Sequence, residues 1–185
     1  NVLTQVYLDA AQQAGYQINN DMNGKNQEGF GLMDTTIYKG KRQSTSVTYL
    51  HPIIRRTNLE VFTNVTVNKI ICENKRAIGV ECKINGTTKK FFSSQEVLLS
   101  AGAINSPQLL MLSGIGPEKE LKKHDIEQVE YLEGVGENLQ DHLETYVQYE
   151  CKKPVTLYSA QNPIRMAFIG IEWFLFKTGI AANSN

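Results

Sequence analysis

Hydrophobic and polar residues recur with different periods along the chain, and these periods predict where helices and strands lie. Residues 2–14 place apolar side chains three or four positions apart and are followed by Gly15, which predicts an amphipathic helix. Residues 163–177 are apolar on almost every face and also predict a helix. We expect this second helix to be buried against neighbours, with an interfacial membrane helix as the alternative.

The stretch from residue 59 to residue 100 has the strongest β pattern. Residues 59–71 are mostly β-formers, and residues 77–84 alternate between apolar and polar side chains. Asn85-Gly86 is a strong signal for a two-residue hairpin turn, so residues 87–92 are expected to return antiparallel. Apolar residues within 96–100 then predict a strand buried on both faces.

Shorter patterns predict the remaining elements. Residues 16–33 are rich in Asn, Gly and Asp and predict a long loop. Ser44 or Thr45 is a suitable cap for a short helix that ends near Leu50. The other expected elements are strands at 34–38, 127–132 and 144–151 and a charged helix at 117–124.

Residues 100–116 lead from the buried strand into a helix. Ser106 suits the N-cap, Pro107 the first helical position, and Gly114 the C-terminal end. The small residues at 101–103 allow another group to approach the backbone closely. A helix N-terminus beside such a turn attracts anions, which favours a phosphate-bearing cofactor. A plain strand-to-helix connection is the alternative interpretation.

Composition and charge narrow the function classes. The chain has 185 residues, with 19 Lys and Arg against 19 Asp and Glu, so no general affinity for nucleic acid or anionic membranes is expected. The cysteines Cys72, Cys82 and Cys151 lack metal-ligand spacing, and reduced thiols are the expected state. We therefore expect an intracellular protein, either cytoplasmic or peripheral at an inner membrane.

The wording of several motifs resembles one known family. The run Ser100-Ala101-Gly102-Ala103-Ile104-Asn105-Ser106-Pro107 to Gly116 closely resembles the second sequence motif of the glucose-methanol-choline (GMC) flavin oxidoreductases. Further matching stretches follow in the family's order: Gly29-Phe30-Gly31, Gly40-Lys41-Arg42-Gln43-Ser44-Thr45, Tyr49-Leu50, Asn58-Leu59-Glu60-Val61 and Gly134-Val135-Gly136-Glu137-Asn138-Leu139-Gln140-Asp141-His142. The resemblance covers nearly the whole chain and is closest to the choline dehydrogenase branch.

The resemblance implies a fold of the α+β or α/β class. Residues 1–140 would form part of a Rossmann-like FAD-binding domain with an inserted β-hairpin, and residues 141–185 the start of a substrate-binding domain. Members of the family are about three times longer and carry a Gly-rich dinucleotide-binding turn and a catalytic histidine. Both motifs are missing here, so we expect an internal fragment without catalytic residues that binds FAD weakly or not at all when isolated.

The resemblance also implies which residues lie near FAD. In the family, the strand that ends at Ala101 and Gly102 lies near the dinucleotide, and the position of Val67 meets the adenine through its backbone. Ala103 and Ile104 follow as further expected neighbours. Taken from the pattern alone, Val67 is a plain core valine.

Residues 141–144, Asp-His-Leu-Glu, combine two carboxylates with an imidazole. They are suited to acid–base chemistry, metal binding or cation recognition, or they form a solvated surface loop. No other residue has convincing metal-ligand spacing, so no metal is expected. The resemblance favours cation recognition: Glu144 matches a glutamate that faces the trimethylammonium group of choline, and His142 would line the same cavity.

The activity implied by the resemblance is the oxidation of choline to betaine aldehyde, with hydride transfer to FAD. The electron acceptor stays open between oxygen and a membrane quinone. Two alternatives remain: a GMC oxidoreductase for another primary alcohol or a sugar, and a non-catalytic binding module that keeps the core of the family.

Overall fold

The computed structural model describes residues 2–153 and 155–182. The chain divides into two compact units. The first, here called the two-segment unit, combines Asn1–Leu59 with Tyr146–Asn185, and the second, the sheet unit, is Glu60–Thr145. Each unit has helices and small sheets, in agreement with the expected mixture of α and β structure.

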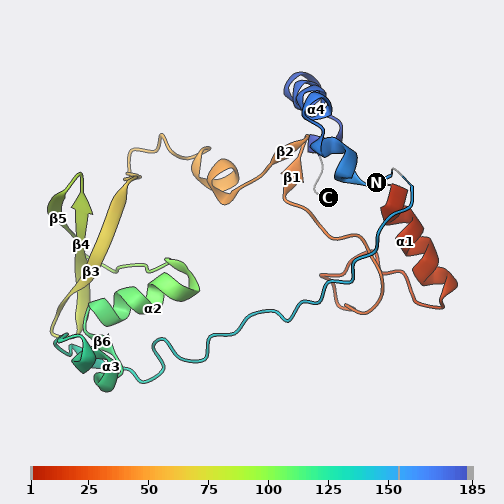
Figure 1. Ribbon diagram of the computed structural model, residues 1–185. Coiled ribbons are helices and arrows are strands. Elements are labelled where there is room, and N and C mark those ends of the chain that lie inside the picture. Colours follow the sequence, from red (N-terminus) through yellow and green to blue (C-terminus); the bar gives the residue numbers. More distant parts are fainter. Residues whose placement is uncertain (1, 154, 183–185) are drawn as a thin grey trace. The chain divides into compact units, whose positions relative to one another are not determined.

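A three-stranded antiparallel sheet forms the centre of the sheet unit (Figure 1). Its strands β3 (Val65–Glu73), β4 (Arg76–Ile84) and β5 (Thr87–Phe92) lie in sequence order. Asn85 and Gly86 have φ values of +50° and +81°, as a type I′ turn requires, so the predicted hairpin is confirmed. β3 begins at Val65 and not at residue 59, because Val65 pairs with Ile84, the last residue of β4.

Helix α2 (Gly102–Leu112) contacts β3, and its N-cap is Ala101. The expected N-cap at Ser106 is therefore wrong, and Pro107 lies inside the helix. The Ser106 hydroxyl instead accepts a hydrogen bond from the Ala101 N–H at 3.1 Å, which allows the helix to begin a turn earlier. Gly114 ends the helix with a φ of +82°, as predicted.

Short elements complete the sheet unit. Strands β6 (Ile115–Gly116) and β7 (Glu130–Tyr131) pair in parallel, and helix α3 (Glu118–Lys123) lies between them in the sequence. The predicted charged helix is confirmed, whereas the predicted strand at 127–132 is reduced to two residues.

Two other predicted strands are wrong. Residues 97–100 form no strand, and the side chain of Leu98 is 81% exposed. Residues 144–151 are also without secondary structure and exposed. An extended segment becomes a strand only when it pairs with a neighbouring strand, and neither segment takes part in the strand pairings of the described residues.

The two-segment unit contains α1 (Val2–Gln13), the short strands β1 (Ile37–Tyr38) and β2 (Lys41–Arg42), and the π-helical turn η1 (Ser46–Leu50). The predicted strand at 34–38 is thus shortened to β1. Ser44, and not Thr45, provides the side-chain cap of η1, since its Oγ accepts from the Val47 N–H at 3.3 Å.

The second segment of this unit contributes η2 (Leu157–Gln161), α4 (Pro163–Phe176) and η3 (Ile180–Ala182). The Asn162 side chain caps α4 by accepting from the N–H groups of Ile164 and Arg165. Trp173 Nε1 donates to the Gly40 carbonyl oxygen at 2.7 Å and thereby connects α4 to the turn between β1 and β2. The compact units therefore divide the chain differently from the 1–140 and 141–185 domains, whose functional division remains a prediction.

Helix α4 is confirmed, but none of its described residues is buried. Its exposed large apolar residues are Ile164, Met166, Phe168, Ile171, Phe174, Leu175 and Phe176. Within residues 2–153 and 155–182, no helix has the length and apolar character needed to cross a membrane.

Candidate functional site

Val67, the residue expected near adenine, lies on β3 opposite Cys82. The register of β3 against β4 shifts between Val67 and Lys69, so a β-bulge lies directly after Val67. The Val67 side chain is 38% exposed and is not part of the buried core. The bulge leaves Asn68, the next residue, without a Cα partner on β4.

The other four expected cofactor neighbours lie at the N-terminal end of α2. Ala101, Gly102, Ala103 and Ile104 are all exposed. Gly102 has a φ of +89°, and no heavy atom lies within 4 Å of the position that a Cβ would occupy. The first N–H groups of a helix have no intrahelical partner and carry partial positive charge. Small side chains and the partial positive charge of the helix start therefore suit a negatively charged dinucleotide.

The two groups belong to the same unit because α2 packs against β3. Val67 lies on the strand that the helix contacts, and residues 101–104 lie at the start of the helix. Val67 and residues 101–104 are more than 30 positions apart in the sequence. The packing of α2 against β3 places them in one unit, and no local sequence pattern predicts this.

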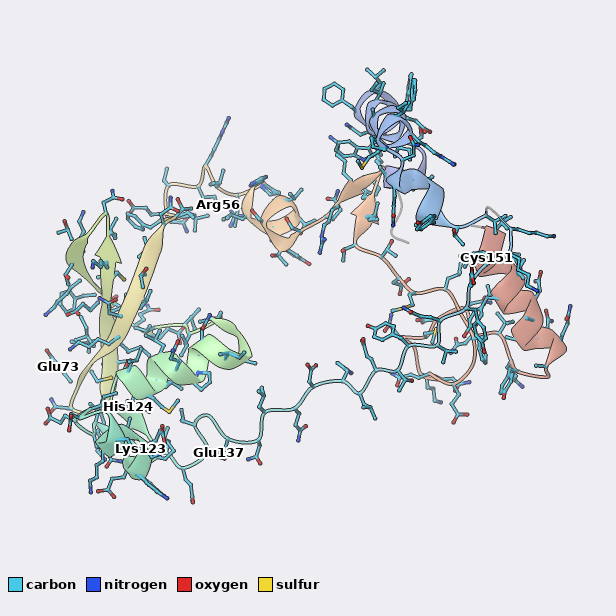
Figure 2. All side chains as sticks on the ribbon, in the orientation of Figure 1. Arg56, Glu73, Lys123, His124, Glu137 and Cys151 are labelled. Carbon is cyan, nitrogen blue, oxygen red and sulfur yellow. The ribbon has the colours of Figure 1, made fainter. Side chains whose placement is uncertain are left out.

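His142 and Glu144 lie at the end of the sheet unit, in an exposed segment without helix or strand. Figure 2 labels Glu137, and the side chains after it stand out along an extended backbone. The Asp141 carboxylate accepts a hydrogen bond from the His142 backbone N–H at 2.8 Å. Within the described part of the chain, no group of His, Cys, Asp or Glu side chains is arranged to hold a metal ion.

Neither of two surface hollows formed by the described residues includes the expected site residues. One of about 700 Å³ lies by α3 and β7 and is lined by residues that include Glu118, Tyr131 and Glu137. The other, of about 500 Å³, lies where the β1–β2 hairpin meets the end of α4 and is lined by residues that include Lys39 and Lys177.

Sequence reasoning missed a buried serine at the end of α2 opposite the expected cofactor neighbours 101–104. Ser113 follows the last residue of α2 and is 7% exposed. Its hydroxyl accepts a hydrogen bond from the Ile70 N–H of β3 at 2.8 Å and donates to the Leu109 carbonyl oxygen at 2.6 Å. A serine placed between an apolar helix and its terminating glycine was the available signal.

Electrostatic interactions in this unit lie at the surface. Lys75 Nζ is 2.7 Å from Glu130 Oε2, and this hydrogen bond lowers the pKa of the Glu130 carboxyl. Lys123, labelled in Figure 2, lowers the pKa of the Glu120 carboxyl in the same way through a 2.6 Å contact. Burial raises the pKa of the Cys72 and Cys82 thiols.

Comparison with known proteins identifies what the chain is similar to. A model of the GMC oxidoreductase family matches residues 1–144. Mitochondrial choline dehydrogenase of Homo sapiens is 53% identical over 179 residues, which cover 97% of this chain and 30% of the relative. Oxygen-dependent choline dehydrogenase of Brucella suis is 47% identical over 185 residues, covering all of this chain and 34% of the relative. The chain thus spans about a third of the length of these relatives.

Solved structures agree with this fold. A FAD-dependent oxidoreductase from Chaetomium thermophilum has a TM-score of 0.80 and 27% identity, over 97% of this chain and 32% of that protein. A formate oxidase has a TM-score of 0.84 over 97% of this chain and 31% of that protein. Its identity of 24% makes it evidence for the fold alone.

Proposed function

The chain belongs to the GMC oxidoreductase family, and from this membership we propose that it is part of an enzyme that oxidises choline to betaine aldehyde. The choline dehydrogenases that match at 47% to 53% identity over nearly the whole chain carry this proposal. Because the chain covers about a third of them, the activity is proposed for a longer protein of which these residues form part.

FAD is the proposed cofactor. The exposed N-terminal end of α2, with Ala101, Gly102 and Ala103, has small side chains, the partial positive charge of a helix start and, at Gly102, open space for a dinucleotide. Val67 would meet the adenine through the backbone beside its bulge, and Ile104 would extend the contact. When bound, the flavin supplies the acceptor for the hydride of the alcohol.

Glu144 is proposed to recognise the cationic head of choline. A quaternary ammonium has no N–H to donate, so charge and aromatic faces are what can select it. A carboxylate in a partly desolvated pocket attracts such an ion far more strongly than one in water. His142, two positions earlier, would line the same cavity. The base that takes the hydroxyl proton is proposed to lie outside this chain.

The substrate proposal is tested with Glu144→Gln in the full-length enzyme. We expect the KM for choline to rise about tenfold or more, since tenfold corresponds to about 1.4 kcal/mol of lost interaction. The KM for 3,3-dimethylbutan-1-ol, an uncharged alcohol of the same shape, should change little. Glu150→Gln is the matched control, because Glu150 is an exposed glutamate of the same extended segment. Equal changes for both alcohols would exclude Glu144 from cation recognition.

The same measurement separates the alternatives. An enzyme for another primary alcohol or a sugar would turn over its substrate with no preference for the cationic alcohol. A non-catalytic binding module would show no flavin reduction by any alcohol.

The exposed apolar residues of α4 are relevant to where the protein is located in the cell. We propose an intracellular protein in which α4 is covered by other residues of the longer chain, with peripheral association with a membrane as the alternative. If the full-length enzyme sediments with phosphatidylserine vesicles, association with a membrane is favoured. If it stays in the supernatant, a helix α4 covered by other residues of the chain is favoured.

A further inference from the structure

Among the described residues, Ser113 is the one with a buried polar side chain. Its hydrogen bond with Ile70 joins parts of the chain that are 43 positions apart. β3 is an edge strand, so its N–H groups that face away from β4 have no strand partner in this sheet. The Ser113 hydroxyl accepts from one of them, the Ile70 N–H, at 2.8 Å. It therefore replaces, at one point, the hydrogen bond that another strand would make.

The hydroxyl uses both of its hydrogen-bonding functions. It accepts from Ile70 and donates to the Leu109 carbonyl oxygen in the last turn of α2, at 2.6 Å. Alanine provides neither function and would leave the Ile70 N–H buried without a partner, which destabilises the contact between α2 and β3. Threonine provides both, because it carries the same hydroxyl.

The residue after Ser113, Gly114, connects the C-terminal end of α2 to the segment before β7. Gly114 has a φ of +82°, and a Cβ there would collide with the Glu127 carbonyl oxygen. The Gly114 carbonyl oxygen also accepts from the Val129 N–H at 2.8 Å. The C-terminal end of α2 is thus fixed to β3 on one side and to the segment before β7 on the other.

The fixed helix carries the proposed cofactor contacts at its opposite end. Residues 101–104 lie at the start of α2, about 16 Å from Ser113 along a helix of 11 residues. Val67 lies three positions before Ile70 on β3, about 10 Å along the strand. The hydrogen bond between Ser113 and Ile70 therefore connects the two elements that carry both proposed contact groups.

We propose that Ser113 is a positioning residue of the flavin site. Its hydroxyl fixes α2 on β3 so that the N-terminal end of the helix and the backbone at Val67 bind the same dinucleotide. The proposal rests on the proposed function, because it takes these residues to contact FAD.

The test compares Ser113→Ala with Ser113→Thr in the full-length enzyme stripped of its flavin. FAD is titrated while its fluorescence is followed, and the folded fraction is measured in parallel by circular dichroism. We expect Ser113→Ala to weaken FAD binding about tenfold and Ser113→Thr to bind within about threefold of wild type. Leu121→Val is the matched control, since Leu121 is a buried residue of the same unit that lies on α3. It should lower stability and leave the FAD affinity of the folded protein unchanged.

Two results would overturn the proposal. In one, the folded fraction of Ser113→Ala binds FAD as tightly as wild type, so that the hydroxyl has a purely structural role. In the other, Leu121→Val weakens FAD binding as much as Ser113→Ala, so that general destabilisation explains the loss. If Ser113→Thr does not fold, the comparison of Ser113→Ala with Leu121→Val decides alone. Failure of the wild-type enzyme to bind FAD would instead overturn the proposed function.

Discussion

The sheet unit and the two-segment unit differ in what they bury. The sheet unit buries Ile70, Cys82, Leu109 and Leu121, together with the hydrogen-bonded Ser113. Among the described residues of the two-segment unit, the buried apolar side chains are those of Ala11 and Ala182. Because apolar burial is the main stabilising contribution to folding, the sheet unit has a core of its own and the two-segment unit has little.

The two units also differ in how far apart their contacting residues are in sequence. In the sheet unit, two-residue turns join β3 to β4 and β4 to β5, so much of the structure forms locally. The two-segment unit requires Gly40 and Trp173 to meet across 133 positions for one hydrogen bond of 2.7 Å. Closing so long a loop costs entropy that a small core does not offset. Stability in this chain is therefore concentrated in residues 60–145.

The largest expected effect comes from Gly114→Ala in the sheet unit. The new Cβ would occupy a left-handed conformation at a φ of +82° and would contact the Glu127 carbonyl oxygen and Val129. Strain and overpacking together should lower the free energy of unfolding by roughly 3 kcal/mol. Urea unfolding followed by far-UV circular dichroism measures this loss.

Gly134→Ala is the control for that substitution. No heavy atom lies within 4 Å of its Cβ position. The unfolding midpoint should change little. An equal loss for both variants would contradict the claim that close contacts at Gly114 fix this unit.

A smaller and local effect is expected from Gly40→Ala in the two-segment unit. A Cβ at Gly40 would collide with the Lys177 carbonyl oxygen and the Ala182 side chain. We expect the exposed β1–β2 hairpin to separate from α4. The hydrogen bond from Trp173 to Gly40 is then lost, which lowers the free energy of unfolding by about 1 kcal/mol. Trp173 is the one tryptophan of the sequence, so its fluorescence should shift to the red while the circular dichroism of the sheet is unchanged.

The smallest expected effect concerns the surface pair of Lys75 and Glu130. Lys75 lowers the pKa of Glu130 in the folded protein below its value in the unfolded chain. The pair therefore stabilises the fold at pH values above the ordinary carboxyl range, and this contribution disappears as the pH falls below about 4. Lys75→Met should reduce the thermal midpoint slightly at pH 7 and not at pH 3, as differential scanning calorimetry measures. A difference that persists in acid would contradict the ionic origin.

The sequence predicted those elements whose signals are local. Asn85-Gly86 specified a hairpin, and the apolar spacing of residues 2–14 and 163–177 specified α1 and α4. The strands expected at 96–100 and 144–151 did not form, because a strand depends on a partner that its own residues do not specify. Ser106 and Pro107 were a plausible start for α2, but the Ala101 N–H bonds the Ser106 hydroxyl and the helix begins earlier.

The candidate site was predictable through family motifs more than through residue chemistry. Alanine, glycine and valine carry no reactive groups, so residues 101–103 and Val67 drew attention mainly through their resemblance to a flavin family. The Ser113 hydroxyl escaped prediction because its importance depends on Ile70, which lies on another element. That all of these residues contribute to one flavin site stays a prediction.

The arrangement of the thiols gives the chain a graded chemical reactivity. Cys82 is 3% exposed, and burial raises the pKa of its thiol, as it does for Cys72, so both carry little of the reactive thiolate at neutral pH. Cys151, labelled in Figure 2, is exposed and lies in the two-segment unit. A maleimide dye would therefore attach first to the less stable half of the molecule, and the later labelling of Cys82 would record how often the sheet opens.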